Sequence, residues 1–412
     1  MTFNLAQEIL DIIIDNLHDD KAALHACSLV SRAWVPSSQL HMFNSITIYM
    51  HRDSVAGTTE YSGFDAFSKA LDVETSGIWR FVRRLVLKSS PEIHQDMGYC
   101  SVEFIHSLLD RLPRLHTLHL AQLKITEELP KEMSPRIHGL KELHLNRLIF
   151  ATTTDLCLLL KVFPQLHSLT ARTLIGMVSS PIIVPLKLQL KTLSLSSPID
   201  SVGVLLSQLM GGGCIDQLTS FTCHMAVDLD PSLLSHVLRT IGPTLKYLEL
   251  HPSSLGSFRE VDFSPCSSID ELRLRIQRFV RLSPNGRSWD AAMHVLTDLS
   301  FTDHPIPIRK VSFCLEFDPC YYHEDILSSV SWPRLAGLFD RAAFSNLKEV
   351  AFEFHEKRWL HSWRQFIPNS GESKEATDFS SQTPRRNNCA SPTPPMFDKD
   401  EKEPRNIQAS LF

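Results

Sequence analysis

Histidine and cysteine are the residue types here that could bind a metal ion or act as nucleophiles, and the chain has 19 and 9 of them. No CxxC motif occurs, and the closest two cysteines are Cys314 and Cys320, which is not the spacing of a zinc site or a disulfide framework. His116 and His119 are three residues apart, which on a strand places them on opposite faces. We interpret the cysteines as reduced, small core residues and expect no metal site.

Motifs of common catalytic sites are missing from the sequence, which contains no G-x-S-x-G, no G-x-x-x-x-G-K-[ST] and no H-E-x-x-H. Gly211, Gly212 and Gly213 are consecutive, but the lysine that a phosphate-binding loop needs does not follow them. We interpret them as a loop at the end of a helix. The sequence therefore predicts a protein that is not an enzyme and binds no cofactor.

Polar residues alternate with aliphatic ones in a series of predicted strands, so the polar residues should share the face opposite the leucines. Their mixture of hydroxyls and both charges suits recognition of a folded protein or a peptide. It lacks the continuous basic stripe or the aromatic rows that nucleic acid needs. The alternative is a solvated sheet surface without a binding role. The candidate target-binding residues are His119, His144, Arg172, Tyr247, His251, Arg273 and Arg275.

The strands themselves are marked by one recurring pattern: aliphatic, two residues, aliphatic, one residue, aliphatic. From Leu118 to Leu299 the middle residues of consecutive copies are 24 to 28 residues apart, within the range of about 20–29 residues for leucine-rich repeats. Two later gaps are irregular and suggest a hairpin or a long insertion between Leu299 and Val350. The middle residues are Leu85, Leu118, Leu143, Leu169, Leu193, Phe221, Leu248, Leu272, Leu299, Val311 and Val350.

Helical periodicity separates the strands, for example over residues 154–163, 201–210 and 231–241. Strand, turn and helix in repetition predict an α/β fold with a parallel sheet and helices on its convex side. The Leu-x-x-Leu-x-Leu core resembles the leucine-rich-repeat family. It departs from the family three residues further on, where positions such as Leu123 and Leu148 replace the usual asparagine or cysteine. We therefore expect an irregular solenoid.

The first 45 residues are predicted to form a small helical cluster. In its second helix Asp20 is the expected N-cap, while Leu24, Cys27 and either Leu29 or Val30 are expected to face inward. A cluster of this size cannot bury much core alone, so it should dock on the solenoid or on a partner. The apolar stripe of its first helix consists of Leu5, Ile9, Ile12, Ile13 and Leu17.

Three segments of this cluster (residues 5–10, 27–34 and 40–43) resemble the F-box, and their residue pattern is most similar to fungal members of that family. The family pattern opens with Leu-Pro-x-Glu-Ile/Leu and continues to a Val-Ser/Cys-Arg-x-Trp signature. Ala6 stands where the family usually has proline, which leaves the tightness of adaptor binding open. By this resemblance the surface for a Skp-type adaptor is formed or supported by Leu5, Ile9, Leu10, Leu24, Val30, Arg32 and Trp34.

The two resemblances together imply a substrate-recognition adaptor of an SCF-type ubiquitin ligase. The adaptor would connect it to a cullin scaffold, and the repeats would hold a target protein whose identity and phosphorylation state stay open. The alternative is an interaction scaffold with an F-box-like cap and no ligase role. The expected units are an F-box-like domain (1–48), a linker and capping segment (49–81), the repeats (82–355), a capping helix (356–367) and a disordered tail (368–412).

Composition agrees with a globular protein and favours neither nucleic acid nor membrane as a partner. Hydrophobic residues make up 43% of the 412 residues, and the formal net charge is only −5. No run reaches the roughly 18 apolar residues of a membrane helix, and the N-terminus lacks the pattern of a signal peptide. We expect a cytoplasmic and/or nuclear location.

Overall fold

The computed structural model describes most of the chain between Ala6 and Phe354. Leu5 and the segment 356–367 lie outside the described residues, as do most of 49–81 and all of 368–412 except Gln408–Ser410. The described ranges are 6–50, 78–89, 98–100, 105, 108–125, 139–175, 186–196, 199–225, 230–252, 260–277, 287–301, 306–316, 332–354 and 408–410.

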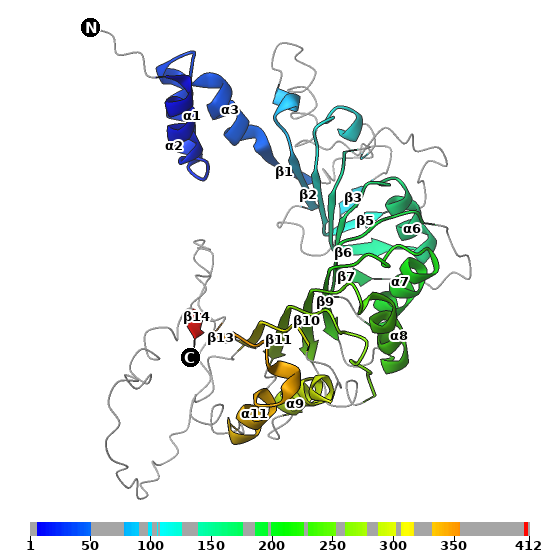
Figure 1. Cartoon of the computed structure of the whole chain (residues 1–412). Helices are drawn as coiled ribbons and strands as arrows, with labels where there is room; N and C mark the ends of the chain where they lie inside the picture. The colour runs from blue at the N-terminus through cyan, green and yellow to red at the C-terminus, as the bar shows by residue number, and fades with distance from the viewer. Residues whose placement is uncertain are drawn as a thin grey trace, which may run out of the picture.

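Three short helices form a cluster at the N-terminus: α1 (Gln7–Asp15), α2 (Lys21–Val30) and α3 (Val35–Asn44). The Asp20 carboxylate accepts a hydrogen bond from the Ala23 amide at 2.9 Å, which confirms the predicted cap of α2. Helix α3 is followed at once by strand β1 (Ser45–Met50), so the cluster is joined to the sheet without an intervening loop (Figure 1).

The N-terminal helices have a core of their own. Leu10, Ile14, Leu24 and Cys27 are buried between them, and none of these four belongs to the main hydrophobic core, whose first member is Ile48. Four buried apolar side chains stabilise the cluster by several kcal/mol, at roughly 1.5–3 kcal/mol for each fully buried large side chain. The molecule thus contains a small helical core and a large one built on the sheet.

The large core rests on a sheet to which the described residues contribute fourteen strands, and twelve of these follow one continuous path in the order of the chain. All pairs between β1 and β13 are parallel, which confirms an α/β fold with a mostly parallel sheet. The strands after β1 on this path are β2 (Arg84–Ser89), β4 (Thr117–Ala121), β6 (Glu142–Phe150), β7 (Ser168–Ile175), β8 (Thr192–Ser196), β9 (Ser220–Met225), β10 (Tyr247–Pro252), β11 (Glu271–Gln277), β12 (Lys310–Glu316), β13 (Glu349–Phe354) and β14 (Gln408–Ser410).

Leucines in the same register make the core continuous from strand to strand. Leu85 pairs with Leu118, Leu118 with Leu143 and Leu143 with Leu169, and all four are fully buried. Ile46 of β1 pairs with Leu85, so the sheet begins at β1 and not at residue 82. At the other end β14 pairs antiparallel with β13. Stacking buries what no single strand could bury alone.

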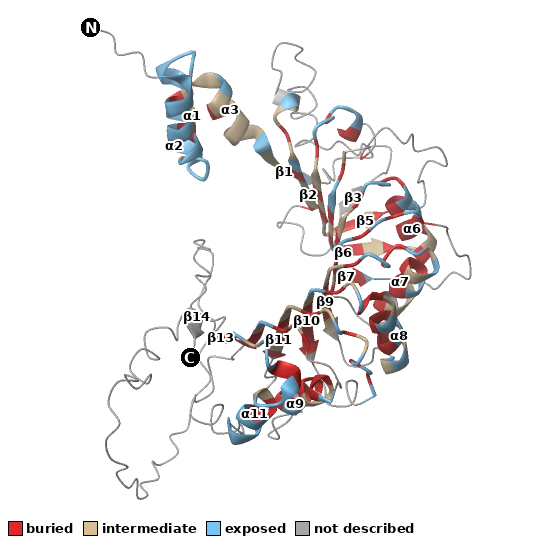
Figure 2. Cartoon of the chain, in the orientation of Figure 1, coloured by how far each residue is buried: buried red, intermediate tan, exposed pale blue. Residues whose placement is uncertain are grey.

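Helices cover one side of the sheet, and the sheet bends into an arc with these helices on the outside (Figure 1). Helix α6 begins with a capping box in which Thr152 and Asp155 bind each other's backbone amides. The buried residues of these helices face the sheet (Figure 2). The helices are α6 (Thr153–Lys161), α7 (Ile199–Gly211), α8 (Pro231–Ile241), α9 (Arg287–Ser300) and α11 (Trp332–Phe339), with short 3-10 turns η1 (Ile78–Arg80) and η2 (Ala342–Phe344).

One predicted strand is wrong. The copy centred on Leu299 is part of helix α9, and Leu272 pairs instead with Val311. Leu296 and Leu299 are buried in either arrangement, because a three-residue spacing of apolar positions also fits one face of a helix. The last two intervals are therefore equal (311 − 272 = 39 and 350 − 311 = 39), and the predicted irregularity after Leu299 is a regular pair of longer units.

Three residues at or within strands have backbone in the left-handed region. Gln122, Arg147 and Thr173 have φ angles of 57°, 51° and 52°, and each stands two residues after the last buried residue of its pattern. Beyond these residues the chain continues in the short strand β5 (Leu123–Ile125), which pairs with β3 (Gly98–Cys100), and in the second halves of β6 and β7. Leu123 and Leu148 are fully buried there, so the core extends where the family has its asparagine or cysteine.

Candidate functional site

The N-terminal helices expose an unusual amount of apolar surface. On α1 the side chains of Ile9, Ile12 and Ile13 are 47%, 60% and 40% exposed, and on α2 those of Leu29 and Val30 are 74% and 68% exposed. Aliphatic side chains of this size, exposed on two short helices that follow each other in the chain, mark an interaction surface more often than chance exposure. We call these five residues the apolar surface of α1 and α2.

The residues assigned to adaptor binding divide into two groups. Ile9, Val30 and Arg32 are exposed and Trp34 is half-buried, so these four can contact a partner. Leu10 and Leu24 are buried inside the cluster and can only support the surface from beneath. Leu5 lies outside the described residues. The expectation that either Leu29 or Val30 faces inward is wrong, because α2 ends at Val30 and both side chains extend into solvent.

Hydrogen bonds between the helices hold this surface in place. The Ser37 hydroxyl of α3 donates to the Asp11 carboxylate of α1 at 2.5 Å, and Gln7 donates to the same carboxylate at 2.9 Å. These two bonds lower the pKa of Asp11, so the carboxylate is a stable acceptor at neutral pH. His41 of α3 lies 2.7 Å from Asp15 of α1. Polar contacts thus fix the angle between α1 and α3 while the apolar side chains remain outside.

The second candidate surface is the polar face of the sheet, opposite the helices. On β4 and β6 the burial pattern alternates along each strand, with Leu118 and Leu143 buried and His119 and His144 half-exposed. His119 pairs in register with His144, and their rings are stacked with centroids 3.9 Å apart. Burial, His144 and Arg84 together lower the pKa of His119 to about 4. This imidazole is therefore neutral at pH 7 and can both donate and accept a hydrogen bond.

Strands β7 to β9 carry small hydroxyl side chains on the same face. Thr170 pairs with Ser194 and Ser194 with Thr222, and all three are half-exposed. Arg172 is exposed at the end of this band. The centre of the polar face is therefore low and rich in hydroxyls, between bulkier groups on either side.

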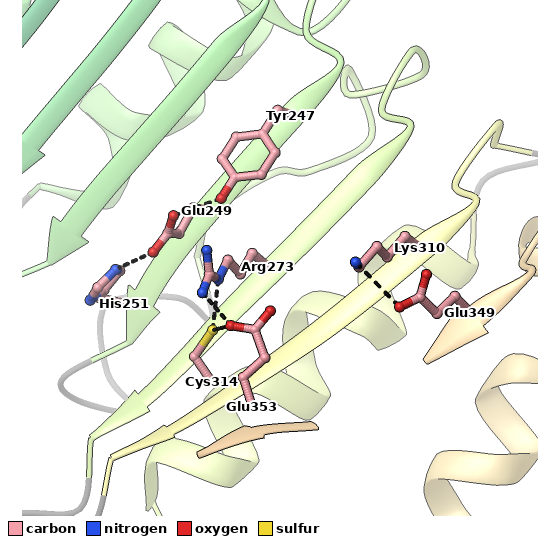
Figure 3. Close-up of polar contacts among 8 residues, drawn as sticks. All are labelled: Tyr247, Glu249, His251, Arg273, Lys310, Cys314, Glu349 and Glu353. Carbon is pink, nitrogen blue, oxygen red and sulfur yellow. Dashed lines mark hydrogen bonds and ion pairs between the residues drawn. The ribbon is translucent and has the colours of Figure 1, made fainter. Parts of the chain in front are cut away.

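Beyond this band, β10 carries a buried hydrogen-bonded group (Figure 3). Glu249 accepts from the Tyr247 hydroxyl at 2.7 Å and lies 2.9 Å from His251. Burial opposes ionisation of Glu249, but the bonds from His251 and Tyr247 outweigh it and lower its pKa to about 2. The His224 ring of β9 lies against the His251 ring. His251 is only 4% exposed, so the expectation that it faces a target directly is wrong and it supports the surface instead.

A charged group joins the next three strands. Arg273 of β11 donates to the Cys314 thiol of β12 at 2.7 Å and forms an ion pair with Glu353 of β13 (Figure 3). Burial raises the pKa of the Cys314 thiol to about 12, so it stays protonated and is a poor nucleophile. Lys310 of β12 and Glu349 of β13 form a second ion pair at 3.2 Å. Arg273 is committed to these contacts, whereas Arg275 keeps a half-exposed side chain on the same strand.

Sequence reasoning missed the partners of Arg273. Cys314 and Glu353 are in register with each other and with Arg275, but only if β11, β12 and β13 are consecutive strands. The false strand at Leu299 concealed this order. The 39-residue spacing of Leu272, Val311 and Val350 is the signal that could have revealed it.

Neither surface offers a metal site or a membrane anchor within the described part of the chain. No three His, Cys, Asp or Glu side chains among those residues are grouped to hold a metal ion. None of the helices described is both long enough and apolar enough to cross a membrane. What the two surfaces provide is hydrophobic contact on the helices and hydrogen-bonding groups on the sheet, the means of binding other macromolecules.

Comparison with known proteins adds no family to these observations. No protein-family model matches the chain, and no curated protein matches its sequence.

Proposed function

We propose that the chain is a substrate-recognition adaptor of an SCF-type ubiquitin ligase and is not itself an enzyme. Helices α1 to α3 act as an F-box that binds a Skp-type adaptor and, through it, a cullin scaffold. The sheet and its helices act as a degenerate leucine-rich-repeat solenoid that holds a target protein. The chain then promotes ubiquitin transfer by proximity, because it holds the target at a high effective concentration near the ubiquitin-charged enzyme.

The observation that carries the proposal is the apolar surface of α1 and α2. Ile9 and Val30, two of the residues implied by the F-box resemblance, are exposed there instead of packing on the sheet. An F-box-like cap that only closes the end of a solenoid would bury these side chains. The helices instead have their own small core and leave five aliphatic side chains in solvent, which is the arrangement that a partner would cover.

Binding of the purified full-length chain to the Skp-type adaptor tests the proposal. The double variant Ile9→Asp/Val30→Asp changes two exposed side chains, so we expect it to fold and to lose at least tenfold in affinity. Phe301→Asp is the matched control, because Phe301 is 70% exposed at the end of α9, far along the chain from the helices. No binding of the wild type, with a normal circular dichroism spectrum, would leave the alternative: a repeat scaffold with an F-box-like cap and no ligase role.

A further inference from the structure

One edge of the sheet carries a regular series of positive charges. The residue directly before each strand belongs to this edge, which we call the amino edge. Its cations are Arg83, Lys141, Lys191, Lys246, Arg309 and Lys348, which precede β2, β6, β8, β10, β12 and β13. On the path β2-β4-β6-β7-β8-β9-β10-β11-β12-β13, a cation therefore stands before every second strand up to β12.

The positions between the cations scarcely reduce this charge. His116, His167 and Thr219 precede β4, β7 and β9, and the one acidic residue, Asp270, is paired with Arg309 at 3.1 Å. The chain as a whole has a net charge of −5, so the positive edge is a local feature and does not follow from composition. Burial lowers the pKa of His116, the nearby charges of Arg83 and Lys141 lower it further, and the charge of Glu142 partly opposes them.

The backbone of the amino edge is held rigidly by hydrogen bonds between neighbouring units. The carbonyl of Lys141 accepts from the amides of His167 and Ser168 at 2.9 and 3.0 Å, and the carbonyl of Lys191 accepts from the next pair in the same way. Each cation is thus fixed at its Cα relative to the next. A surface that is already ordered loses less entropy on binding than a flexible one.

Most of these cations are available to a ligand. Lys141, Lys191, Lys246 and Lys348 are exposed and Arg83 is half-exposed. None of the five forms an ion pair with another described residue. Glu142, beside this edge, is engaged by the hydroxyl of Thr117 at 3.1 Å. Within the described part of the chain, these five positive charges therefore form a row without ion-pair partners.

We propose that the amino edge of the sheet binds an extended acidic segment of a partner protein. Neighbouring strands are about 4.8 Å apart, so cations on every second strand are about 10 Å apart. An extended chain in the polyproline II conformation advances about 3.1 Å per residue with three residues per turn, so carboxylates at every third position lie on one side, about 9 Å apart, and match this spacing. The segment from Arg83 to Lys246 spans six strand intervals, about 29 Å, which accommodates roughly nine residues of an extended peptide.

An acidic peptide fits this edge better than nucleic acid does. Each strand of a duplex carries a charge every 3.4 Å or so, much more densely than one cation per 10 Å can neutralise. Single strands also need aromatic side chains on which bases can stack. The first residue of each strand adjoins the amino edge, and from β2 to β12 one of these residues is aromatic, Tyr247. The Tyr247 hydroxyl donates a hydrogen bond to Glu249. Because no residue of α1 to α3 takes part, the proposal stands whether or not the adaptor binds.

Fluorescence anisotropy with the full-length chain at low salt tests the proposal. The probes are a labelled 12-residue peptide with glutamate at every third position, a peptide of the same composition with its glutamates adjacent, and a 12-nucleotide oligothymidylate. We expect the spaced peptide to bind best and its affinity to fall at least tenfold in the variant Lys141→Glu/Lys191→Glu/Lys246→Glu. The milder variant Lys141→Gln/Lys191→Gln/Lys246→Gln should lose about threefold in affinity for the spaced peptide. It keeps the test valid if the glutamate variant does not fold.

The control variant Lys88→Glu/Lys124→Glu/Arg147→Glu makes the same change in net charge near the opposite ends of the strands. We expect it to keep the affinity of the wild type within twofold. An equal loss in the control would show a diffuse charge effect and overturn the proposal. Absence of binding by both peptides would overturn it as well, as would tighter binding of the oligonucleotide than of the spaced peptide.

Discussion

The N-terminal helices and the sheet use apolar residues in opposite ways. In the sheet, Leu85, Leu118 and Leu143 are each fully buried because the next strand and the covering helices complete their surroundings. In α1 and α2, Ile12 and Leu29 remain 60% and 74% exposed, because no further layer among the described residues covers these short helices. Apolar periodicity therefore predicts which face of an element is apolar. Whether the chain itself buries that face depends on the number of neighbouring layers.

Replacing one leucine in each region should show the largest difference in stability between the sheet and the N-terminal helices. Leu248 of β10 is fully buried, and Leu248→Ala should lower the free energy of unfolding by about 2–5 kcal/mol, since it leaves a cavity in a continuous core. Leu29→Ala removes the same atoms from a side chain that is 74% exposed, and it should change stability by less than about 0.5 kcal/mol. Urea denaturation followed by circular dichroism measures both. Equal effects would mean that Leu29 is buried in solution.

Acid should destabilise the sheet through histidines of its polar face. The pKa of His119 is about 4 in the folded chain, below its usual 6.5, because burial and nearby positive charges oppose protonation. Below pH 6.5 the unfolded chain takes up a proton that the folded chain refuses, so stability falls between pH 6.5 and about 4. The variant His119→Gln has no imidazole to protonate, so its free energy of unfolding should fall less over this pH range, by on the order of 1 kcal/mol. The difference is modest because water screens the charge of a half-exposed ring.

Thermal unfolding at several pH values measures this effect. His236→Gln is the matched control, because His236 lies exposed on α8. A stability profile between pH 6.5 and 4 that is the same for His119→Gln and the wild type would contradict the assignment. Glu249 acts in a lower window, since its folded pKa of about 2 means that its contribution is present above its ordinary pKa and is lost as the pH falls toward 2.

Much of the sheet could be predicted from the sequence, because a strand with one buried face repeats its pattern every second residue and parallel stacking aligns the copies. The register from Leu118 to Leu272 follows directly from that spacing. Leu299 was misassigned because three apolar positions fit a helix as well as a strand, and only pairing with a neighbour distinguishes them. The burial of His251 could not be predicted either, since it depends on the His224 ring of the adjacent strand.

The caps of one helix in each region should show that the two cores unfold separately. Asp20→Ala removes the cap of α2, and Thr152→Ala removes the capping box of α6. Each change should cost about 0.5–2 kcal/mol. Hydrogen exchange should show faster exchange in α1 to α3 for the first variant, and in α6 with its neighbouring strands for the second. Faster exchange of the whole chain in both variants would show instead that the two cores unfold as one cooperative unit.

The smallest expected effect concerns Ala6, where the F-box family usually has proline. Ala6 precedes the first residue of α1 and has a φ of −60°, which is close to the value that a proline ring imposes. Its amide forms no hydrogen bond with another described residue, so proline would remove no contact there. Ala6→Pro should therefore stabilise the helical cluster by about 0.4–1 kcal/mol, because it restricts the unfolded chain more than the folded one.

Hydrogen exchange of α1 to α3 measures this gain, and the sheet should be unaffected because the two cores are separate. Ala33→Pro is the control, because the Ala33 amide donates a hydrogen bond to the Ser31 hydroxyl oxygen at 3.3 Å and proline has no N–H group to form it. If Ala6→Pro also tightens adaptor binding while the exposed side chains stay unchanged, the helices bind as a preformed surface. A loss of stability in Ala6→Pro would mean that the backbone before α1 adopts another conformation in solution.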